Sequence, residues 1–392
     1  MNKSILRYLK HVIITILIGV PVFLAIGALT GATIKYSRNA LVDNWDGEGP
    51  YIFHESDSLL TINYIKGNRD DGFHVEMISS TPDSSMSLEF YYPIDSTHVN
   101  FKLHTEFDIP KSIYADEHKI LAISDIESNY KTFRDFLINS GVIDHELNWT
   151  FGQNHLVLVG DFIDRSYFST QVLWFIYKLD QDAIAQGGHV HYILGNHEIM
   201  NMQGDHRYAK SKYHHVAAIL GKKQFEFYGQ HSVLGRWMAS KNTIELINGN
   251  LFVHGGIHPD LASSELTIDQ INQLVRAHYY QPYFPKKGGD ETQDLLTSNR
   301  TSPYWYRGYF RGDLSQEDVD VGLQKFDADA VIVGHTIQSK VNRSHNGKVI
   351  GIDVKHPSDY YKYIPKIGSE GLIIEDGKYY RVLANGKTKE LR

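Results

Sequence analysis

The sequence predicts an α/β protein, and three features of its 392 residues indicate this class. An uncharged apolar stretch occupies residues 12–34, close to the N-terminus. Residues 45–115 contain strand-like segments separated by turn clusters, with no helical period. From residue 118 onward, apolar strands alternate with amphipathic helices, a pattern typical of a central sheet covered by helices.

The apolar stretch at residues 12–34 is long enough to cross a bilayer as a helix, so we expect a transmembrane anchor there. Residues 1–11 carry Lys3, Arg7 and Lys10, and the positive-inside rule places this basic segment in the cytoplasm. The bulk of the chain is then periplasmic or otherwise extracytoplasmic. The small-residue run GALTGA also fits a signal-peptide cleavage region, and the alternative is therefore a secreted chain.

The amino-acid composition excludes some binding partners and some kinds of chemistry. The hydrophobic fraction of 42% and the charged fraction of 22% allow a sizeable globular core. The net charge of −7 argues against a duplex-binding protein, and we expect no nucleic-acid partner. The chain has no cysteine, which excludes disulfides, thiolate metal ligands and a cysteine nucleophile, whereas its 21 histidines can supply imidazole ligands.

These observations divide the chain into predicted segments. Residues 35–44 are expected to form a linker after the anchor, and residues 45–115 a small antiparallel β-rich module with a spacer or packing role. Residues 116–392 are expected to form the main α/β domain, because the strand–helix alternation begins there.

Polar side chains follow five consecutive strands of this main domain, at the point where each strand ends. They are Asp125 and Glu127; Asp161, Asp164 and Arg165; Asn196, His197 and Glu198; His254; and His335. Ligands of open α/β sheets gather at the carboxyl ends of the strands, so we expect these side chains to converge at one edge.

The chemistry of this set fits two adjacent divalent metal ions. Carboxylate, amide and imidazole donors suit manganese, iron or zinc better than calcium, and manganese is our first expectation. Asp161 is the candidate bridging ligand, because its strand should be central. Two such ions would activate a bridging hydroxide and hold both oxygens of an in-line displacement at phosphorus.

The motifs that carry these residues resemble the calcineurin-like metallophosphoesterase superfamily. D-x-E, GDFIDR, GNHE, HGG and GH occur in that order, and the resemblance extends over residues 118–355. The sequences of three of these motifs, GDFIDR, GNHE and VHGGIHPDL, resemble those of the phosphoprotein phosphatases. The runs GNHEIMNMQGDHRY and SPYWYRG resemble the bacterial Shewanella-like branch. The implied fold is a four-layer αββα sandwich, here preceded by the β-rich module and the transmembrane helix.

The resemblance also implies a role for each residue. The first metal would be bound by Asp125, Glu127 and Asp161, and the second by Asp161, Asn196, His254 and His335. His197 would be the general acid, oriented by Asp164. Phosphate would be bound by Arg165, Arg307 and Asn196.

Three positions depart from the pattern of the family. Glu127 stands where most relatives have histidine, which should shift the metal preference toward manganese or magnesium. Ser166 replaces a glycine beside the phosphate loop. Ile337 replaces the second histidine of a GHxH pair, which fits phosphoprotein phosphatases and argues against typical nucleotidases.

The function that we expect is a metal-dependent phosphomonoesterase acting on phosphoserine, phosphothreonine or phosphotyrosine in proteins or peptides, or on a small phosphate ester. One alternative is a phosphodiesterase or a nucleotide or dinucleoside-polyphosphate hydrolase of the same superfamily. Another is a catalytically weak, membrane-anchored binding protein, for which Glu127 would be the indication.

Overall fold

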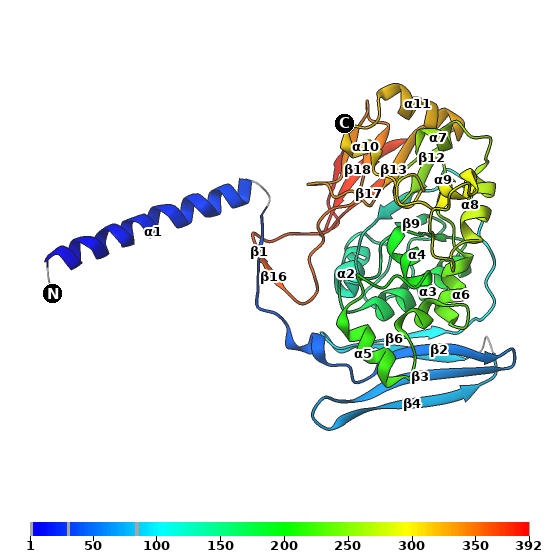
Figure 1. Cartoon of the computed structure of the whole chain (residues 1–392), viewed down its shortest axis with the longest axis horizontal. Helices are drawn as coiled ribbons and strands as arrows, with labels where there is room; N and C mark the ends of the chain where they lie inside the picture. The colour runs from blue at the N-terminus through cyan, green and yellow to red at the C-terminus, as the bar shows by residue number, and fades with distance from the viewer. Residues whose placement is uncertain (1–2, 30–31, 83–85, 392) are drawn as a thin grey trace.

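The computed structural model describes residues 3–29, 32–82 and 86–391. Helix α1 (Lys3–Leu29) projects from a body that contains the rest of the described chain (Figure 1). Of this helix, Lys3–Gly27 is long and apolar enough to cross a membrane, with a mean hydropathy of 2.3. It begins earlier than the predicted residue 12, because Lys and Arg are good helix formers and the basic segment continues the helix.

The C-terminal end of the apolar helix also differs from the prediction, because the helix ends at Leu29 and not at residue 34. Ile34 belongs to strand β1 (Ile34–Tyr36), which pairs antiparallel with β16 (Lys362–Ile364). Residues 35 and 36, which were predicted to belong to the linker, therefore lie in a paired β-strand. The β-branched and aromatic side chains at 34 and 36 suit a strand, and β16 supplies the hydrogen-bonding partner.

Two six-stranded sheets form the centre of the body. In spatial order, the first contains β10 (His189–Ile193), β9 (His155–Val159), β8 (Ile120–Ile123), β17 (Glu370–Glu375), β18 (Lys378–Leu383) and β19 (Thr388–Glu390). The second contains β14 (Asn342–Ser344), β15 (Val349–Gly351), β13 (Ala330–Val333), β12 (Asn250–Val253), β11 (Ile244–Ile247) and β7 (Ile113–Tyr114). Strands β8, β9 and β10 are parallel, as are β12, β13 and β15, so the carboxyl ends within each group lie at one edge.

Alternate side chains of these strands belong to two different cores. Val157 and Val159 of β9 pack with Phe252 and Ile332 of the second sheet, between the sheets. Leu156, on the other face of β9, belongs to the core that includes the outer helices. A strand covered on both faces is a continuous apolar run, as HLVLV is at β9.

Helices complete the layers outside the sheets. They are α2 (Tyr130–Asn139), α3 (Ser169–Ala185), α4 (Asn196–Met202), α5 (Ser211–Ile219), α6 (Val233–Ser240), α7 (Pro259–Ala262), α8 (Ile268–Arg276), α9 (Glu291–Thr297), α10 (Gly308–Arg311) and α11 (Gln316–Lys325), with 3-10 turns η1 (Ala40–Asp43) and η2 (Gln224–Tyr228). Helices α2 and α3 share the outer core of the first sheet, and α7 and α11 that of the second. The order of layers is helix, sheet, sheet and helix.

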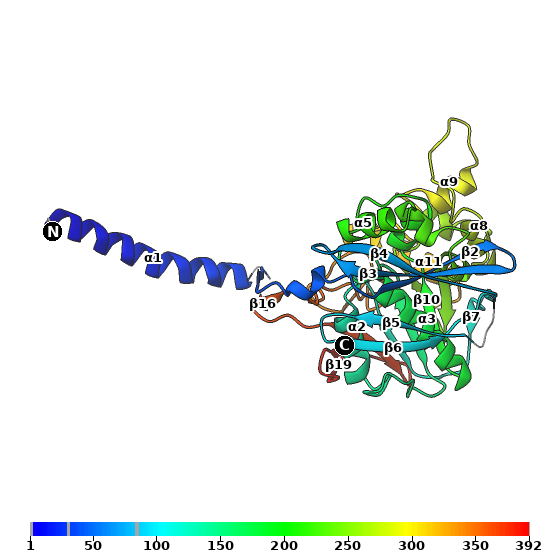
Figure 2. The ribbon, with the colours of Figure 1, turned by 90° about the horizontal axis from the view of Figure 1, so that it is seen from below.

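The β-rich segment forms an antiparallel sheet and a hairpin. The sheet contains β2 (Glu48–Ser56), β3 (Leu59–Asn68) and β4 (Gly72–Ser80), and the hairpin β5 (Ser87–Tyr92) and β6 (Thr97–Lys102). These strands lie below α3 in Figure 1 and in front of it in Figure 2, where the body is seen from below.

This segment packs closely on the catalytic part. The ring of Phe101 stacks on that of Trp174 with a centroid separation of 4.6 Å, and Trp174 Nε1 donates to the carbonyl of Pro50 over 2.9 Å. Glu48 and Lys212 form a buried ion pair of 2.8 Å across the contact. Strand β7, inside the predicted module, pairs with β11 of the catalytic sheet, so the segment and the catalytic part share a sheet and a core.

Candidate metal centre and active site

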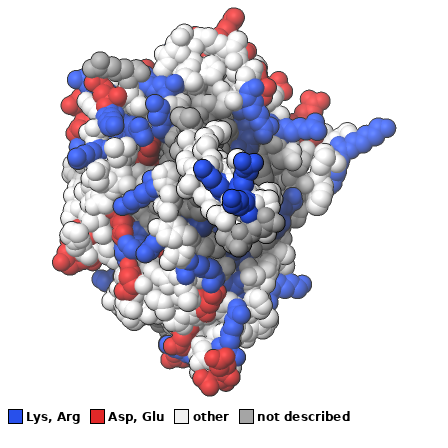
Figure 3. All heavy atoms as spheres, turned by 90° about the vertical axis from the view of Figure 1, so that its left-hand side faces the viewer, with Lys and Arg blue, Asp and Glu red and all other residues white. Residues whose placement is uncertain are grey.

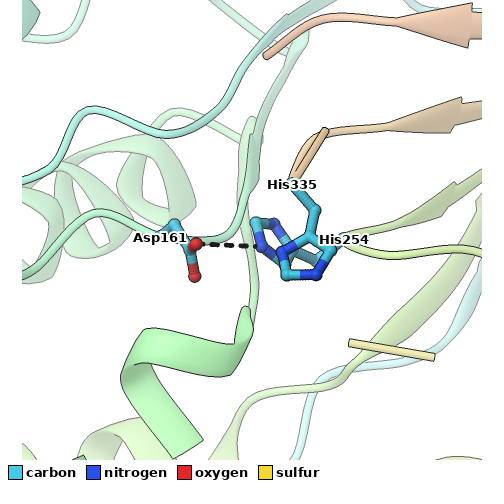
Figure 4. A group of neighbouring side chains, drawn as sticks. All are labelled: Asp161, His254 and His335. Carbon is cyan, nitrogen blue, oxygen red and sulfur yellow. Dashed lines mark ion pairs between the residues drawn. The ribbon is translucent and has the colours of Figure 1, made fainter. Parts of the chain in front are cut away.

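Loops that follow the parallel strands of both sheets meet at one edge of the sandwich. Figure 4 shows Asp161, His254 and His335 pointing toward one another from three of these loops. Their ligand atoms all lie within 4.8 Å of one another, and all three side chains are buried. His254 Nε2 is 3.1 Å from Asp161 Oδ2 and 3.2 Å from the amide oxygen of Asn196.

Hydrogen bonds on the far side of each imidazole fix which ring nitrogen faces the centre. His254 Nδ1 donates to the carbonyl of Val159 over 2.7 Å, which leaves Nε2 toward Asp161. His335 Nε2 donates to the carbonyl of Trp305 over 3.0 Å, which leaves Nδ1 as the nitrogen with a lone pair; Arg307 Nη2 lies 3.4 Å from it. Histidine ligands of metal sites are commonly oriented by such hydrogen bonds to backbone carbonyls.

The two imidazoles differ in their electrostatic surroundings. Burial alone would lower the pKa of His254, but the Asp161 carboxylate raises it to about 9. Burial lowers the pKa of His335 well below its usual value, and the nearby His254 acts in the same direction. The ring of His335 is therefore neutral, which is the form that binds metal ions.

The backbone at the centre is held in a conformation that residues other than glycine rarely adopt. Asp125, Asp161 and His335 have φ of 54°, 60° and 64°, in the left-handed region. Such a conformation costs about 1–2 kcal/mol per residue and persists where the surrounding structure enforces it, as at functional sites. Gly160 lets the chain approach His254, because a Cβ atom there would lie 2.5 Å from Nδ1.

Acidic side chains gather beside the imidazoles. Burial raises the pKa of Asp125 to about 7, and the negative charge of Asp161 adds to the shift. Burial also raises the pKa of Asp353 well above its usual value, with Asp125 and Glu127 acting in the same direction. Several carboxyl groups in one buried region repel one another and favour a bound polyvalent cation, so the donor set fits a metal centre. Asp353, which follows β15, was not among the predicted site residues.

A buried dyad adjoins the metal centre. His197 Nδ1 is 2.8 Å from Asp164 Oδ2, and both side chains are at most 2% exposed. The amide of Asn201 donates to the same Asp164 oxygen over 2.9 Å. Burial would lower the pKa of His197, but Asp161 and Asp164 raise it, which favours a protonated ring. His197 Nε2 lies 3.8 Å from Asp161 Oδ2, so the dyad faces the metal centre.

Both predicted arginines lie at the site. Arg165 forms an ion pair with Glu127, and its Nη2 is 3.0 Å from His197 Nε2. Arg307 contacts the carbonyl of His335 and lies 3.4 Å from Thr336 Oγ1. Glu127 lies outside the group formed by Asp161, His254 and His335, and its carboxylate faces Arg165. Both guanidinium groups therefore contact residues of the predicted site.

Glu198 was singled out in the sequence but not assigned a role. Its carboxylate accepts hydrogen bonds from the backbone N–H groups of Asp161, Phe162 and Gly195, over 2.8–2.9 Å. The hydroxyl of Tyr192 donates to it as well. Glu198 therefore ties the loop that carries Asp161 to the loop that carries Asn196 and His197. The signal in the sequence was an acidic residue directly after the Asn-His pair.

Tyr208, the last residue of the run GNHEIMNMQGDHRY, was not assigned a role from the sequence. Its ring centroid is 5.0 Å from that of His197 and 5.7 Å from the guanidinium carbon of Arg165. The side chain is 43% exposed, so an apolar surface is available beside the dyad. Its neighbour Arg207 instead pairs with Asp205 on the surface. The place of Tyr208 at the end of the run GNHEIMNMQGDHRY was the signal in the sequence that could have indicated it.

The sequence profile described as calcineurin-like phosphoesterase matches residues 118–339, more than half of the chain, and the chain therefore belongs to this family. The family uses a dinuclear divalent metal centre, and the chain is a metal-dependent phosphoric ester hydrolase. This confirms the predicted superfamily and the predicted class of reaction.

Several phosphatases are similar to this chain. The crystal structure of the cold-active protein-tyrosine phosphatase of a psychrophilic Shewanella species is 32% identical, with a TM-score of 0.77 over 88% of this chain and 99% of that one. Shewanella-like protein phosphatase 2 of Arabidopsis thaliana is 24% identical over 338 residues, 71% of this chain and 81% of that protein. Shewanella-like protein phosphatase 1 of Plasmodium berghei is 29% identical over 236 residues, 56% of this chain and 61% of that protein.

Proposed function

We propose that this phosphatase acts on phosphorylated proteins or peptides, with phosphotyrosine as the preferred ester. The observation that carries the proposal is the exposed ring of Tyr208 beside the His197–Asp164 dyad, where the aryl group of a phosphotyrosine could stack. The similarity to the Shewanella protein-tyrosine phosphatase, which extends over 99% of that chain, supports the same choice.

We propose two sets of metal ligands, and the close approach of Asp161, His254, His335 and Asn196 supports them. Asp125, Glu127 and Asp161 would hold one ion. The other would be held by Asp161, Asn196, His254 and His335. A pair of divalent ions held there would supply an activated hydroxide and would neutralise charge on the phosphate. We propose manganese as the preferred ion, because Glu127 adds a hard oxygen donor in place of an imidazole.

The remaining roles belong to side chains of the chain itself. Arg165 and Arg307 would bind the phosphate oxygens, aided by the amide of Asn196. Hydroxide attacks phosphorus and the bond to the leaving oxygen breaks. That oxygen takes the proton from His197 Nε2, so the products are inorganic phosphate and the free alcohol or phenol. Asp164, hydrogen-bonded to Nδ1 over 2.8 Å, holds the ring in place and stabilises its protonated form.

We further propose that α1 anchors the chain in a membrane, with the basic N-terminus in the cytoplasm and the catalytic body on the other side. The apolar length of Lys3–Gly27 supports a membrane span. Lys3, Arg7 and Lys10 at its start support the orientation.

A substrate panel tests the proposed function. The full chain, purified in detergent and loaded with manganese, is assayed on phosphotyrosine, phosphoserine and phosphothreonine forms of one peptide, on a phosphodiester and on a dinucleoside polyphosphate. We expect the highest kcat/KM on the phosphotyrosine peptide. Faster hydrolysis of the diester or the polyphosphate would contradict a protein substrate, and equal rates on the three peptides would contradict the preference for tyrosine.

A further inference from the structure

The ribbon formed by β1 and β16 lies between helix α1 and the catalytic body (Figure 1). Helix α1 ends at Leu29 and β1 begins at Ile34, so at most about 18 Å of extended chain separates them. If α1 spans a membrane, the ribbon must therefore lie close to the membrane surface. The argument that follows rests on the proposed anchoring by α1.

The strand register shows which face of the ribbon turns toward the body. Lys35 pairs with Tyr363, and the hydroxyl of Tyr363 lies 2.8 Å from Ser358 Oγ and 3.1 Å from its backbone N–H. The ammonium group of Lys35 also lies 5.8 Å from the ring of Tyr361. Because successive side chains of a strand point to opposite faces, the positions on either side of Lys35 and Tyr363 point away from the body.

That outward face is apolar and exposed. Ile34 pairs with Ile364, and these side chains are 51% and 56% exposed. Tyr36 pairs with Lys362 on the same face and is 44% exposed. An aliphatic pair next to a tyrosine and a lysine is the composition of membrane–water interfaces, where aromatic rings and long basic side chains lie at the headgroup level.

The segments around the ribbon are strongly basic. Residues 32–40 and 355–366 contain four lysines, one arginine and one acidic side chain: Lys35, Lys355, Lys362, Lys366, Arg38 and Asp359. Arg38 is paired with Asp43, so the four lysines carry the positive charge of this face. The carboxylate of Asp359 accepts hydrogen bonds from the backbone N–H groups of Lys131 and Thr132. Figure 3 looks along α1 onto this side of the molecule and shows Lys and Arg side chains around the helix.

We propose that the β1–β16 ribbon binds the surface of an anionic lipid bilayer, with Ile34, Tyr36 and Ile364 inserted among the headgroups and the lysines on lipid phosphates. Apolar insertion next to basic side chains is the combination that binds peripheral segments to acidic membranes. The ribbon then makes a second contact with the membrane that α1 enters.

This contact would orient the active site relative to the membrane. The ring of Tyr360, shortly before β16, lies 5.0 Å from that of Tyr167, and the guanidinium of Arg38 lies 5.8 Å from the same ring. Tyr167 is two residues beyond Arg165, in the loop that lines the active site. Docking of the ribbon therefore fixes the position of this loop above the bilayer, which a helical tether alone would leave variable.

Site-specific fluorescence tests the proposal without any assay of activity. The chain has no cysteine, so Ile364→Cys provides a single labelling site for an environment-sensitive dye. Phe284→Cys, at a side chain that is 74% exposed and distant in sequence from the ribbon, is the matched control. The full chain is reconstituted into vesicles of phosphatidylcholine alone or with added phosphatidylglycerol, some of which carry a shallow lipid-borne quencher.

We expect a blue-shifted emission and quenching for the dye at position 364, stronger with phosphatidylglycerol, and neither for the dye at position 284. Equal signals at the two positions would overturn the proposal, and equal quenching in the two lipids would overturn the role of anionic headgroups. Lys362→Glu with Lys366→Glu should reduce the quenching, whereas Lys286→Glu with Lys287→Glu should not. Mass spectrometry of the reconstituted chain must show that α1 is intact; its removal would also overturn the proposal.

Discussion

Asp164 Oδ2 and His197 Nδ1 lie 2.8 Å apart, in a pair of side chains that is closed to solvent and faces the cluster of metal-binding side chains. A single hydrogen bond thus connects a fixed carboxylate to a ring that can deliver a proton to the bond being broken. Asn201 donates to the same carboxylate oxygen and holds it in position. This arrangement makes the dyad the first target for mutation.

Replacement of His197 by alanine should lower kcat about 10²–10⁴-fold on an alkyl or phenyl phosphate, because a poor leaving group needs the proton. The loss should be smaller on p-nitrophenyl phosphate, whose leaving group is stable as an anion. Asp164→Asn should act in the same direction. Bound metal is measured alongside, and His214→Ala on the surface of α5 is the control. Turnover of the poor substrate at the level of the native chain would refute the role of the dyad.

The metal preference should depend on residue 127. Glu127→His restores the imidazole of most relatives, so we expect the variant to retain two ions and to be activated best by a softer ion, such as zinc or iron. The test is activity after chelation and reconstitution with each ion in turn. The same order of activating ions in both proteins would show that Glu127 is not a ligand.

Tyr208 should contribute to the recognition of phosphotyrosine. Loss of one aromatic contact is worth about 1 kcal/mol, so Tyr208→Ala should lower kcat/KM on a phosphotyrosine peptide about five-fold, mainly through KM. Tyr208→Phe keeps the ring and should behave like the native chain. A phosphoserine peptide serves as the internal comparison, and an equal loss on both peptides would indicate a structural effect instead of recognition of the aryl group.

The β-rich segment should be needed for the stability of the catalytic body. Lys212 is buried against Glu48 of β2, and burial lowers its pKa while Glu48 opposes the shift. Removal of one partner of a buried pair costs about 3–5 kcal/mol, so Glu48→Gln should lower the free energy of unfolding by about that amount. Glu76→Gln, in an exposed pair with Lys66, should change it by at most about 1 kcal/mol. Urea unfolding measures both, and similar small effects would mean that β2 packs loosely on the body.

His155 should make stability depend on pH. Burial lowers its pKa to about 4, against the opposing effect of Asp116, while His191 and His189 add to the lowering. The unfolded chain therefore takes up a proton near pH 6.5 that the folded chain accepts only near pH 4. Stability is lost as the pH falls through this window, by at most about 1.4 kcal/mol per pH unit from this group.

The contribution of His155 is measured by comparing native and variant chains. The quantity compared is the slope of the free energy of unfolding against pH, between pH 7 and pH 5. His155→Gln keeps a donor toward Asp116 but cannot be protonated, so its slope should be shallower than that of the native chain. His98→Gln, at a side chain that is 54% exposed, should leave the slope unchanged. An identical slope for native and His155→Gln chains would refute the assignment.

The residues that sequence reasoning could place are those at strand ends. Asp125, Asp161 and His254 each follow an apolar strand, and the rule that ligands gather at carboxyl edges predicts that they meet. The motifs that carry these residues then indicated the family by their resemblance to it. The pairing of β10, β9 and β8 follows from the same alternation of strands and helices.

Contacts between distant segments could not be predicted in this way. Asp353 lies in a loop without a motif, and Tyr208 ends the run GNHEIMNMQGDHRY without a role that its chemistry alone indicates; their positions depend on how the second sheet and the loop before α5 pack. The antiparallel ribbon of β1 and β16 joins segments more than three hundred residues apart, and nothing local indicates that pairing. The same holds for β7, which the strand-like pattern assigned to the β-rich module but which pairs with β11.

Metal analysis of the purified full chain is the most direct measurement. We expect two divalent ions per chain by mass spectrometry of the metals, and near-complete loss of both in Asp161→Asn, since this one carboxylate is shared by the two proposed sites. A chain that binds no stoichiometric metal, or an Asp161→Asn variant that keeps both ions, would contradict a dinuclear centre built on Asp161.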